Sequence, residues 1–232
     1  LPYSWFNLTD ALANTSGLSY IIGGTTYTIN YPPGFYDISN LNQYFQDQMF
    51  INGHYLVDGN ENNVYYLSFS TNSIYFRTTL VCSPVPTSLP SGWTNPRSLA
   101  LSGKTPQIVF SGATNFRNLL GFNAGTYPPT SQTALLQYNG QVAPVIDTVS
   151  AVNITCNWVN ASKFSFRPNL LASFVPDNAF GTLLAYSPFS LTMLPVRQWE
   201  SIEIGLYDQA WRPLAIDNPN QIQISLQLDT YE

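Results

Sequence analysis

The strongest constraint on the fold is the regular alternation of apolar and polar residues near the end of the chain. In residues 201–208 (SIEIGLYD), Ile202, Ile204 and Leu206 alternate with polar or small residues, and residues 221–228 (QIQISLQL) alternate in the same way. A period of two places apolar side chains on one face of a strand and polar side chains on the other. Two such strands predict a sheet with one face on a core, as in a β-sandwich.

The rest of the chain repeats this pattern in shorter runs that glycines and prolines separate. We predict a hairpin in residues 18–31 around Gly23-Gly24, and two strands in residues 64–82 around a turn at Thr71-Asn72. Further strands are expected in residues 107–112 (QIVFSG), 141–147 (QVAPVID) and 149–159 (VSAVNITCNWV), the last with a bulge near Val152–Asn153. Residues 163–199 are expected to contain short strands broken by prolines. Residues 83–106 and 125–131 are expected to be loops. The pattern indicates an all-β fold.

Residues 32–50 (PPGFYDISNLNQYFQDQMF) interrupt this β pattern with a predicted helix over 38–49. The Pro-Pro-Gly run stops strand pairing, and the Asp37 side chain can accept from the free amides of a first helical turn. The apolar residues then follow at the spacing of one helical face: Leu41, Tyr44, Phe45 and Met49. We expect this face to close one end of the sandwich.

A second, shorter helix is expected at residues 114–121. Thr114 can cap its start, and Gly121 lies where a left-handed terminal residue is needed, so that Phe122 could fold back on Phe116. With both helices in connections between strands, the order of elements favours a jelly-roll or Greek-key β-sandwich. We expect residues 1–232 to form a single jelly-roll domain with elaborated loops.

The composition points to a surface with few charges. Charged residues make up 9% of the chain, against roughly 25% in an average soluble domain. One interpretation is an extracellular β domain with an amide-rich surface; the other is a subunit whose surface neighbouring copies cover. The net charge is −5, and the eight Lys and Arg residues are scattered, so direct nucleic-acid binding is not expected. A membrane-spanning segment is not expected either, since the chain has no apolar run of sufficient length.

The sequence offers little for catalysis, and we expect no catalytic, cofactor-binding or metal-binding residues. The single histidine, His54, lies in a turn-like segment and is interpreted as a surface residue. Cys82 and Cys156 show no metal-binding spacing; two buried free thiols are favoured over a disulfide. Glu200 and Glu203 would point to opposite faces of a strand. The remaining acidic candidates lie where turns need aspartate: Asp208, Asp217 and Asp229.

Two further surface features are open to a functional interpretation. Trp93 and Trp211 lie in loops where exposed rings could stack on sugars, although aromatic residues are also common anchors of subunit interfaces. Four Asn-x-Ser/Thr triplets begin at Asn7, Asn14, Asn153 and Asn160. A chain this rich in Asn, Ser and Thr contains about that many by chance, so they do not indicate glycosylation.

Three segments, in this order, resemble parts of the capsid proteins of virophages, Polinton-like viruses and adintoviruses. Residues 33–45 (PGFYDISNLNQYF) are similar to the PGxY-x-hydrophobic-x-x-Leu start of those proteins. Residues 115–122 (NFRNLLGF), followed by TYPPT at 126–130, are similar to their LGF…YP element. Residues 202–214 (IEIGLYDQAWRPL) and 222–228 (IQISLQL) resemble their last jelly-roll strands, with an Asp-centred turn.

The resemblance implies a structural, non-enzymatic jelly-roll capsid subunit located in the virion. The length suits one jelly roll, as in the penton protein, which forms homopentamers at the five-fold vertices next to the major capsid protein. A minor capsid protein and a fragment of a major capsid protein remain alternatives, as does a carbohydrate-binding β-sandwich. The loops at 83–106 and 123–131 would be free to meet neighbouring subunits, a receptor or a glycan. No cofactor is implied.

Overall fold

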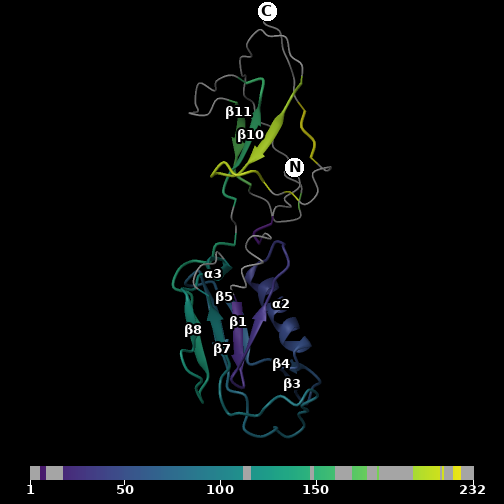
Figure 1. The fold of residues 1–232 in the computed structure, drawn as a ribbon, viewed down its shortest axis with the longest axis vertical. Helices are drawn as coiled ribbons and strands as arrows, with labels where there is room; N and C mark the ends of the chain where they lie inside the picture. The colour runs from purple at the N-terminus through teal and green to yellow at the C-terminus, as the bar shows by residue number, and fades with distance from the viewer. Residues whose placement is uncertain are drawn as a thin grey trace, which may run out of the picture. The chain divides into compact units, whose positions relative to one another are not determined.

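The computed structural model of the chain describes residues 6–8, 18–111, 116–146, 149–159, 169–176, 182, 201–214, 216 and 222–225 (Figure 1). These residues form mostly antiparallel β-sheets with two short helices, in agreement with the predicted all-β class. The chain divides into two compact units, residues 7–146 and residues 1–6 with 147–232. The expectation of one domain over 1–232 stays a prediction, because a domain is defined by independent folding as well as by compactness.

The first sheet of the 7–146 unit has the strand order β2-β1-β7-β8. The predicted hairpin joins β1 (Leu18–Ile22) to β2 (Thr25–Ile29), and Gly23 and Gly24 have φ angles of 59° and 82°, which this two-residue turn requires. β7 (Gln107–Phe110) confirms the strand predicted at 107–112 within the described residues. β8 (Gly125–Tyr127) lies where a loop was expected; three residues are too few to show a strand period.

The second sheet has the order β5-β6-β9, with β5 (Leu67–Asn72), β6 (Arg77–Cys82) and β9 (Leu136–Asn139). The predicted turn at Thr71-Asn72 is wrong, because the ladder continues to the pair Asn72–Arg77 and the turn spans residues 73–76. A separate two-stranded sheet joins β3 (Leu56–Val57) to β4 (Asn63–Val64). The predicted loop at 83–106 is confirmed, apart from an isolated bridge between Val57 and Thr94.

The strand predicted at 141–147 is wrong over its described part, residues 141–146, which contain no strand. These residues instead return to the second helix, α3 (Phe116–Leu120), and its C-terminal cap. The Val142 amide donates to the carbonyl of Gly121 at 3.1 Å, and the Val145 amide donates to that of Asn118 at 3.0 Å. The backbone donors that a sheet would use are therefore satisfied by a helix end.

The first helix, α2 (Ile38–Ile51), confirms the predicted helix and extends two residues beyond it. Asp37 caps it as expected, since its Oδ1 accepts from the Asn40 amide at 2.7 Å. The helix ends in a Schellman motif around Gly53, which has a φ of 77°. In this motif the His54 amide donates to the Met49 carbonyl at 2.8 Å and the Gly53 amide to the Phe50 carbonyl at 3.0 Å.

The α2 helix covers an edge of the second sheet. Its buried residues are Ile38, Leu41, Phe45 and Met49, and Tyr44 packs against the same core while half-exposed. The side-chain Oδ1 of Asn42 accepts a hydrogen bond from the Phe69 amide of β5 at 2.7 Å. A polar side chain of the helix thus satisfies a donor on an edge strand, which would otherwise be open to another strand.

The α3 helix has the expected C-terminal geometry. Gly121 has a φ of 73°, and the amides of Gly121 and Phe122 donate to the carbonyls of Asn118 and Arg117 at 3.2 and 3.1 Å, which is again a Schellman motif. The Phe122 ring stacks on Phe110, with centroids 5.0 Å apart. Its expected contact with Phe116 stays a prediction, and the proposed cap Thr114 lies outside the described residues.

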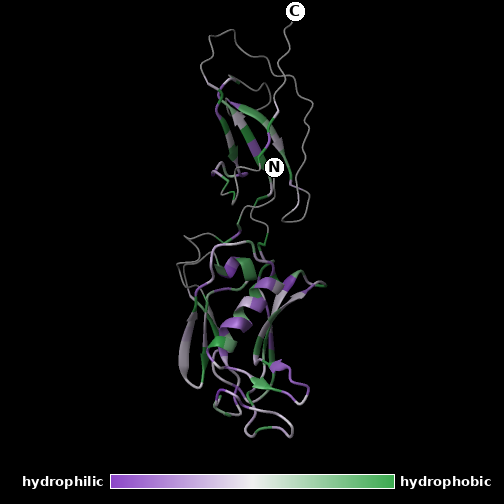
Figure 2. Cartoon of the chain, turned by 90° about the vertical axis from the view of Figure 1, so that its right-hand side faces the viewer, coloured by the Kyte–Doolittle hydropathy of each residue, from purple (hydrophilic) through white to green (hydrophobic). Residues whose placement is uncertain are grey.

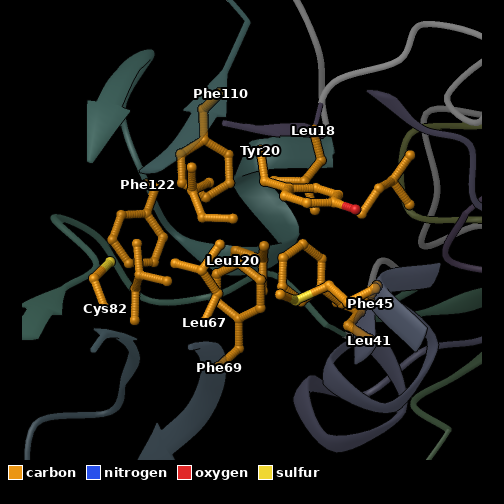
Figure 3. Close-up of a cluster of buried hydrophobic side chains, with 14 of the residues drawn as sticks. Leu18, Tyr20, Leu41, Phe45, Leu67, Phe69, Cys82, Phe110, Leu120 and Phe122 are labelled. Atoms are coloured by element: carbon orange, nitrogen blue, oxygen red, sulfur yellow. The ribbon is translucent and has the colours of Figure 1, made fainter. Parts of the chain in front are cut away.

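One hydrophobic core joins the two larger sheets and both helices of the 7–146 unit. Figure 3 shows Tyr20 of β1, Phe45 of α2, Phe69 of β5, Phe110 of β7 and Phe122 pointing toward one another. The ring of Phe69 lies 5.5 Å from that of Phe45 and 6.5 Å from that of Phe110, centroid to centroid. The alternation of hydrophobic and hydrophilic residues along α2 and the strands (Figure 2) supplies this core.

The second unit contains a three-stranded antiparallel sheet in the order β11-β10-β12. Its strands are β10 (Val152–Cys156), β11 (Leu170–Phe174) and β12 (Ile204–Tyr207). The predicted irregularity of β10 is present, but the register shifts between Ile154 and Thr155, not at Val152–Asn153. The strand predicted at 221–228 is wrong over residues 222–225, which are described without strand structure; the other residues of that strand, and most of 163–199, lie outside the described residues.

Candidate interaction surface

His54, expected at the surface, is instead buried, with 9% of its area exposed. The prediction was wrong because the Schellman motif at Gly53 turns the following residue back toward the helix and the core. The Nδ1 of His54 lies 2.8 Å from the Tyr20 hydroxyl, which also accepts from the side-chain Nδ2 of Asn52 at 2.8 Å. The Tyr27 ring packs on the imidazole, with centroids 4.4 Å apart. Glycine followed by a ring-bearing residue at a helix end was the available sequence signal.

The hydrogen bonds around His54 join it to Tyr20 and Asn52. The side-chain NH₂ of Asn52 donates to the Tyr20 oxygen, and that hydroxyl shares a further hydrogen bond with Nδ1 of His54, whose direction depends on the imidazole tautomer. Burial lowers the pKa of His54 and raises the pKa of Tyr20 to about 12, so both groups stay uncharged at neutral pH. The cluster is a satisfied structural network and not a site open to substrate.

Both cysteines are free and buried, as the sequence predicted. Burial raises the pKa of the Cys82 thiol to about 12, which leaves almost no thiolate at neutral pH. Its Sγ lies 3.8 Å from the carbonyl oxygen of Tyr127. Cys82 thus behaves as a small core residue.

The acidic residues that the sequence singled out are only partly within the described chain. Glu203 is exposed at the start of β12, whereas Glu200, Asp217 and Asp229 lie outside the described residues. Over the part of the chain that the structure describes, no group of three or more His, Cys, Asp or Glu side chains is arranged to hold a metal ion.

Asp208 has the turn role that the sequence predicted for it. Its Oδ1 accepts from the amides of Ala210 and Arg212 at 2.8 and 2.9 Å, and its Oδ2 accepts from Nε of Arg212 at 2.7 Å. Burial by itself would raise the pKa of this carboxyl, but the hydrogen bonds from Arg212 and Ala210 outweigh it and lower the pKa. Asp208 is therefore an ionised turn residue that closes the loop after β12.

Two asparagines that begin glycosylation triplets use their side chains inside the fold. The buried Asn7 donates from Nδ2 to the carbonyls of Tyr36 and Ile146 at 2.8 and 2.9 Å. The buried Asn153 donates from Nδ2 to the carbonyl of Asp208 at 2.8 Å. A glycan on either nitrogen would break these bonds. Asn14 and Asn160 lie outside the described residues.

The two tryptophans proposed as sugar platforms are only half-exposed. Trp93 packs against the core of the 7–146 unit, and its amide donates to the Pro90 carbonyl at 3.1 Å. Trp211 packs near Tyr207, with centroids 6.0 Å apart, in the turn that Asp208 organises. The two rings belong to different compact units.

Three consecutive large apolar residues are exposed at the turn between β5 and β6, among them the two most exposed of the described chain, Ile74 and Phe76. Ile74, Tyr75 and Phe76 expose 80%, 64% and 75% of their areas. The turn is well formed, because the Tyr75 amide donates to Oδ1 of Asn72 at 3.2 Å, next to the closing pair Asn72–Arg77. We call residues 73–76 the hairpin tip. The sequence did not predict this tip, because the turn expected at Thr71-Asn72 lies two residues earlier than the observed one.

Phe76 in the hairpin tip has a left-handed backbone, with a φ of 50°. This conformation costs a residue with a side chain about 1–2 kcal/mol relative to glycine, and asparagine relieves part of that cost. A turn that served only stability would carry one of those residues at 76. The phenylalanine there is both strained and exposed.

Other large apolar residues are exposed over both units. In the described part of the chain, outside the hairpin tip, they are Phe50, Ile51, Leu89, Leu135, Val142, Val145, Val175, Ile202 and Ile224. Leu89 belongs to the loop 83–106 that the sequence proposed as a contact region. Within the loop 123–131, most of the residues are exposed and polar or small.

Comparison with protein families, curated proteins and solved structures finds no match to this chain. Within the described residues, neither helix has the length and hydrophobicity needed to cross a membrane. The functional interpretation therefore rests on the residues and geometry described above.

Proposed function

We propose that the chain is a structural subunit of a viral capsid, most consistent with a penton protein that forms homopentamers at five-fold vertices beside the major capsid protein. The proposal is supported by the antiparallel β architecture and by the resemblance of three ordered segments to jelly-roll capsid proteins. The jelly-roll topology itself is part of this proposal, as is its place in the virion.

The observation that carries the proposal is the combination of few charges with many exposed apolar side chains. Only 9% of the residues are charged, and nine large apolar residues of the described chain are exposed outside the hairpin tip. Charges normally keep soluble copies apart by repulsion, whereas covering exposed apolar side chains lowers the free energy of an assembly. Repetition of one contact around a closed ring covers such surface on every copy.

Light scattering after size-exclusion chromatography tests this proposal on the purified chain. A mass of five chains, 25.8 kDa each, is the expected result. A trimer would instead favour a protein of the major-capsid type. A monomer that persists at high concentration, and in the presence of the major capsid protein, would contradict the proposal.

A further inference from the structure

We propose that the hairpin tip, residues 73–76, inserts into the surface of a lipid bilayer. This inference does not depend on the capsid proposal, since it concerns one local feature and a different kind of partner. It rests on the shape, hydrophobicity and charge of the β5–β6 hairpin.

The β5–β6 ladder supports the hairpin tip directly. Six consecutive residue pairs join β5 to β6, from Leu67–Cys82 to Asn72–Arg77, and β9 pairs with the other side of β6. At the end of this ladder away from the tip, the paired Leu67 and Cys82 are fully buried in the core. A firmly held ribbon therefore presents Ile74, Tyr75 and Phe76 without the ordering cost that a mobile loop would carry.

The apolar surface of the hairpin tip is small. Three exposed side chains of this kind present a few hundred Å², whereas each partner in a stable protein–protein interface contributes about 800 Å². The tip by itself is too small for such an interface and protrudes from the end of a ribbon. A bilayer needs no complementary recess and accepts an aromatic and aliphatic tip at the depth of the headgroups.

The charges of the β5–β6 hairpin also favour an anionic lipid surface. The hairpin from Leu67 to Cys82 has no acidic residue and one basic residue, Arg77, directly after the tip. The acid-free stretch is much longer: residues 62–146 contain no Asp or Glu and four basic residues, Arg77, Arg97, Lys104 and Arg117, in a chain with a net charge of −5. The sequence from β5 to β9 therefore offers anionic headgroups no acidic residue. The Arg77 guanidinium donates from Nη1 to the Phe76 carbonyl at 3.2 Å and has further N–H donors for a phosphate beside the tip.

Vesicle flotation with the full-length chain tests the proposal. The probes are unilamellar vesicles of phosphatidylcholine alone and of phosphatidylcholine with phosphatidylserine. We expect the wild-type chain to float with both, more strongly with the anionic vesicles. Ile74→Ser combined with Phe76→Ser should lower the bound fraction at least about tenfold, because two apolar side chains no longer insert. Binding should survive 0.5 M salt, since screening weakens only the contribution of Arg77.

Ile51→Ser is the matched control for Ile74→Ser. Ile51 is 67% exposed at the end of α2, outside the hairpin tip, so its loss should leave flotation unchanged. Thermal unfolding should be nearly the same for all variants because the substituted side chains are exposed. The absence of wild-type flotation would overturn the proposal, as would equal flotation of the tip variant. So would a tip variant that changes the mass of the lipid-free protein, because a second copy would then cover the tip.

Discussion

The two compact units of this chain differ in the contacts that stabilise each of them internally. In residues 7–146, one core cluster contains 24 buried apolar residues, including the rings of Tyr20, Phe45 and Phe110. In the described part of the other unit, the cluster contains three, Val149, Val152 and Phe174. There, a polar turn around Asp208 ties the strands together. The 7–146 unit therefore depends mainly on apolar burial, whereas the described sheet of the other unit depends strongly on hydrogen bonds.

The largest effect is expected from the core of the 7–146 unit. Phe45→Ala removes a fully buried ring that contacts Tyr20 and Phe69, and should lower the free energy of unfolding by about 3–5 kcal/mol. Urea unfolding with hydrogen-exchange mass spectrometry would show which strands lose protection. Ile51→Ala, on the exposed side of the same helix, should change stability by less than about 0.5 kcal/mol.

The pattern of lost protection in Phe45→Ala distinguishes two kinds of fold. If the units differ as described, β1, β5 and β7 lose protection while β10 and β12 keep theirs. Equal loss in all strands would break the comparison and would favour the single cooperative domain predicted from the sequence.

The second effect concerns the polar turn of the other unit. Asp208→Ala removes the acceptor for the amides of Ala210 and Arg212 and for the Arg212 guanidinium, and should cost that unit about 2–3 kcal/mol. Protection of β10 and β12 should fall, because the turn also positions the backbone carbonyl of Asp208, which accepts from the Asn153 side chain of β10. Glu203→Ala, an exposed carboxylate near the same strand, is the control. Unchanged protection in Asp208→Ala would mean that apolar contacts hold this sheet after all.

Local patterns predicted much of the fold, and tertiary contacts decided the rest. The helix at 38–49 and the hairpin at Gly23-Gly24 were predictable because capping, spacing and turn chemistry act over a few residues. β8 and β9 were not, since their residues GTY and LQYN lack the β-branched apolar pair Ile108-Val109 that marks the equally short β7. Register likewise moved the turn from Thr71-Asn72 to residues 73–76, because cross-strand pairing continues to Arg77.

The candidate surface was less predictable than the fold. The low charge that supports the capsid proposal is visible in the composition, but the hairpin tip depends on a turn position that only the pairing of β5 with β6 defines. His54 was placed wrongly for a related reason. A lone histidine in a turn-like segment is usually exposed, and its burial here follows from the helix cap at Gly53 and from the hydrogen bond that it shares with the Tyr20 hydroxyl.

The smallest predicted effect is a dependence of stability on mildly acidic pH. Burial lowers the pKa of His54 in the folded state below its ordinary value of 6.5. Below pH 6.5 the unfolded chain therefore takes up a proton that the folded chain resists, so stability is complete above that pH and falls as the pH is lowered. Because His54 is the only histidine, a slope between pH 6.5 and 5 in urea unfolding is assigned to it.

His54→Gln should flatten that slope, because glutamine can still meet the Tyr20 hydroxyl but does not take up a proton in this range. Hydrogen exchange at pH 5.2 should show the acid effect in β1 and the end of α2, which carry Tyr20 and Asn52, and not in β10. An acid effect between pH 6.5 and 5 that persists in His54→Gln would contradict the assignment to His54. Asp208 would not explain it, because the lowered pKa of Asp208 makes its contribution disappear only at a more acidic pH. The pH at which each part loses protection would then distinguish the 7–146 unit, which buries His54, from the β11-β10-β12 sheet next to the ionised Asp208.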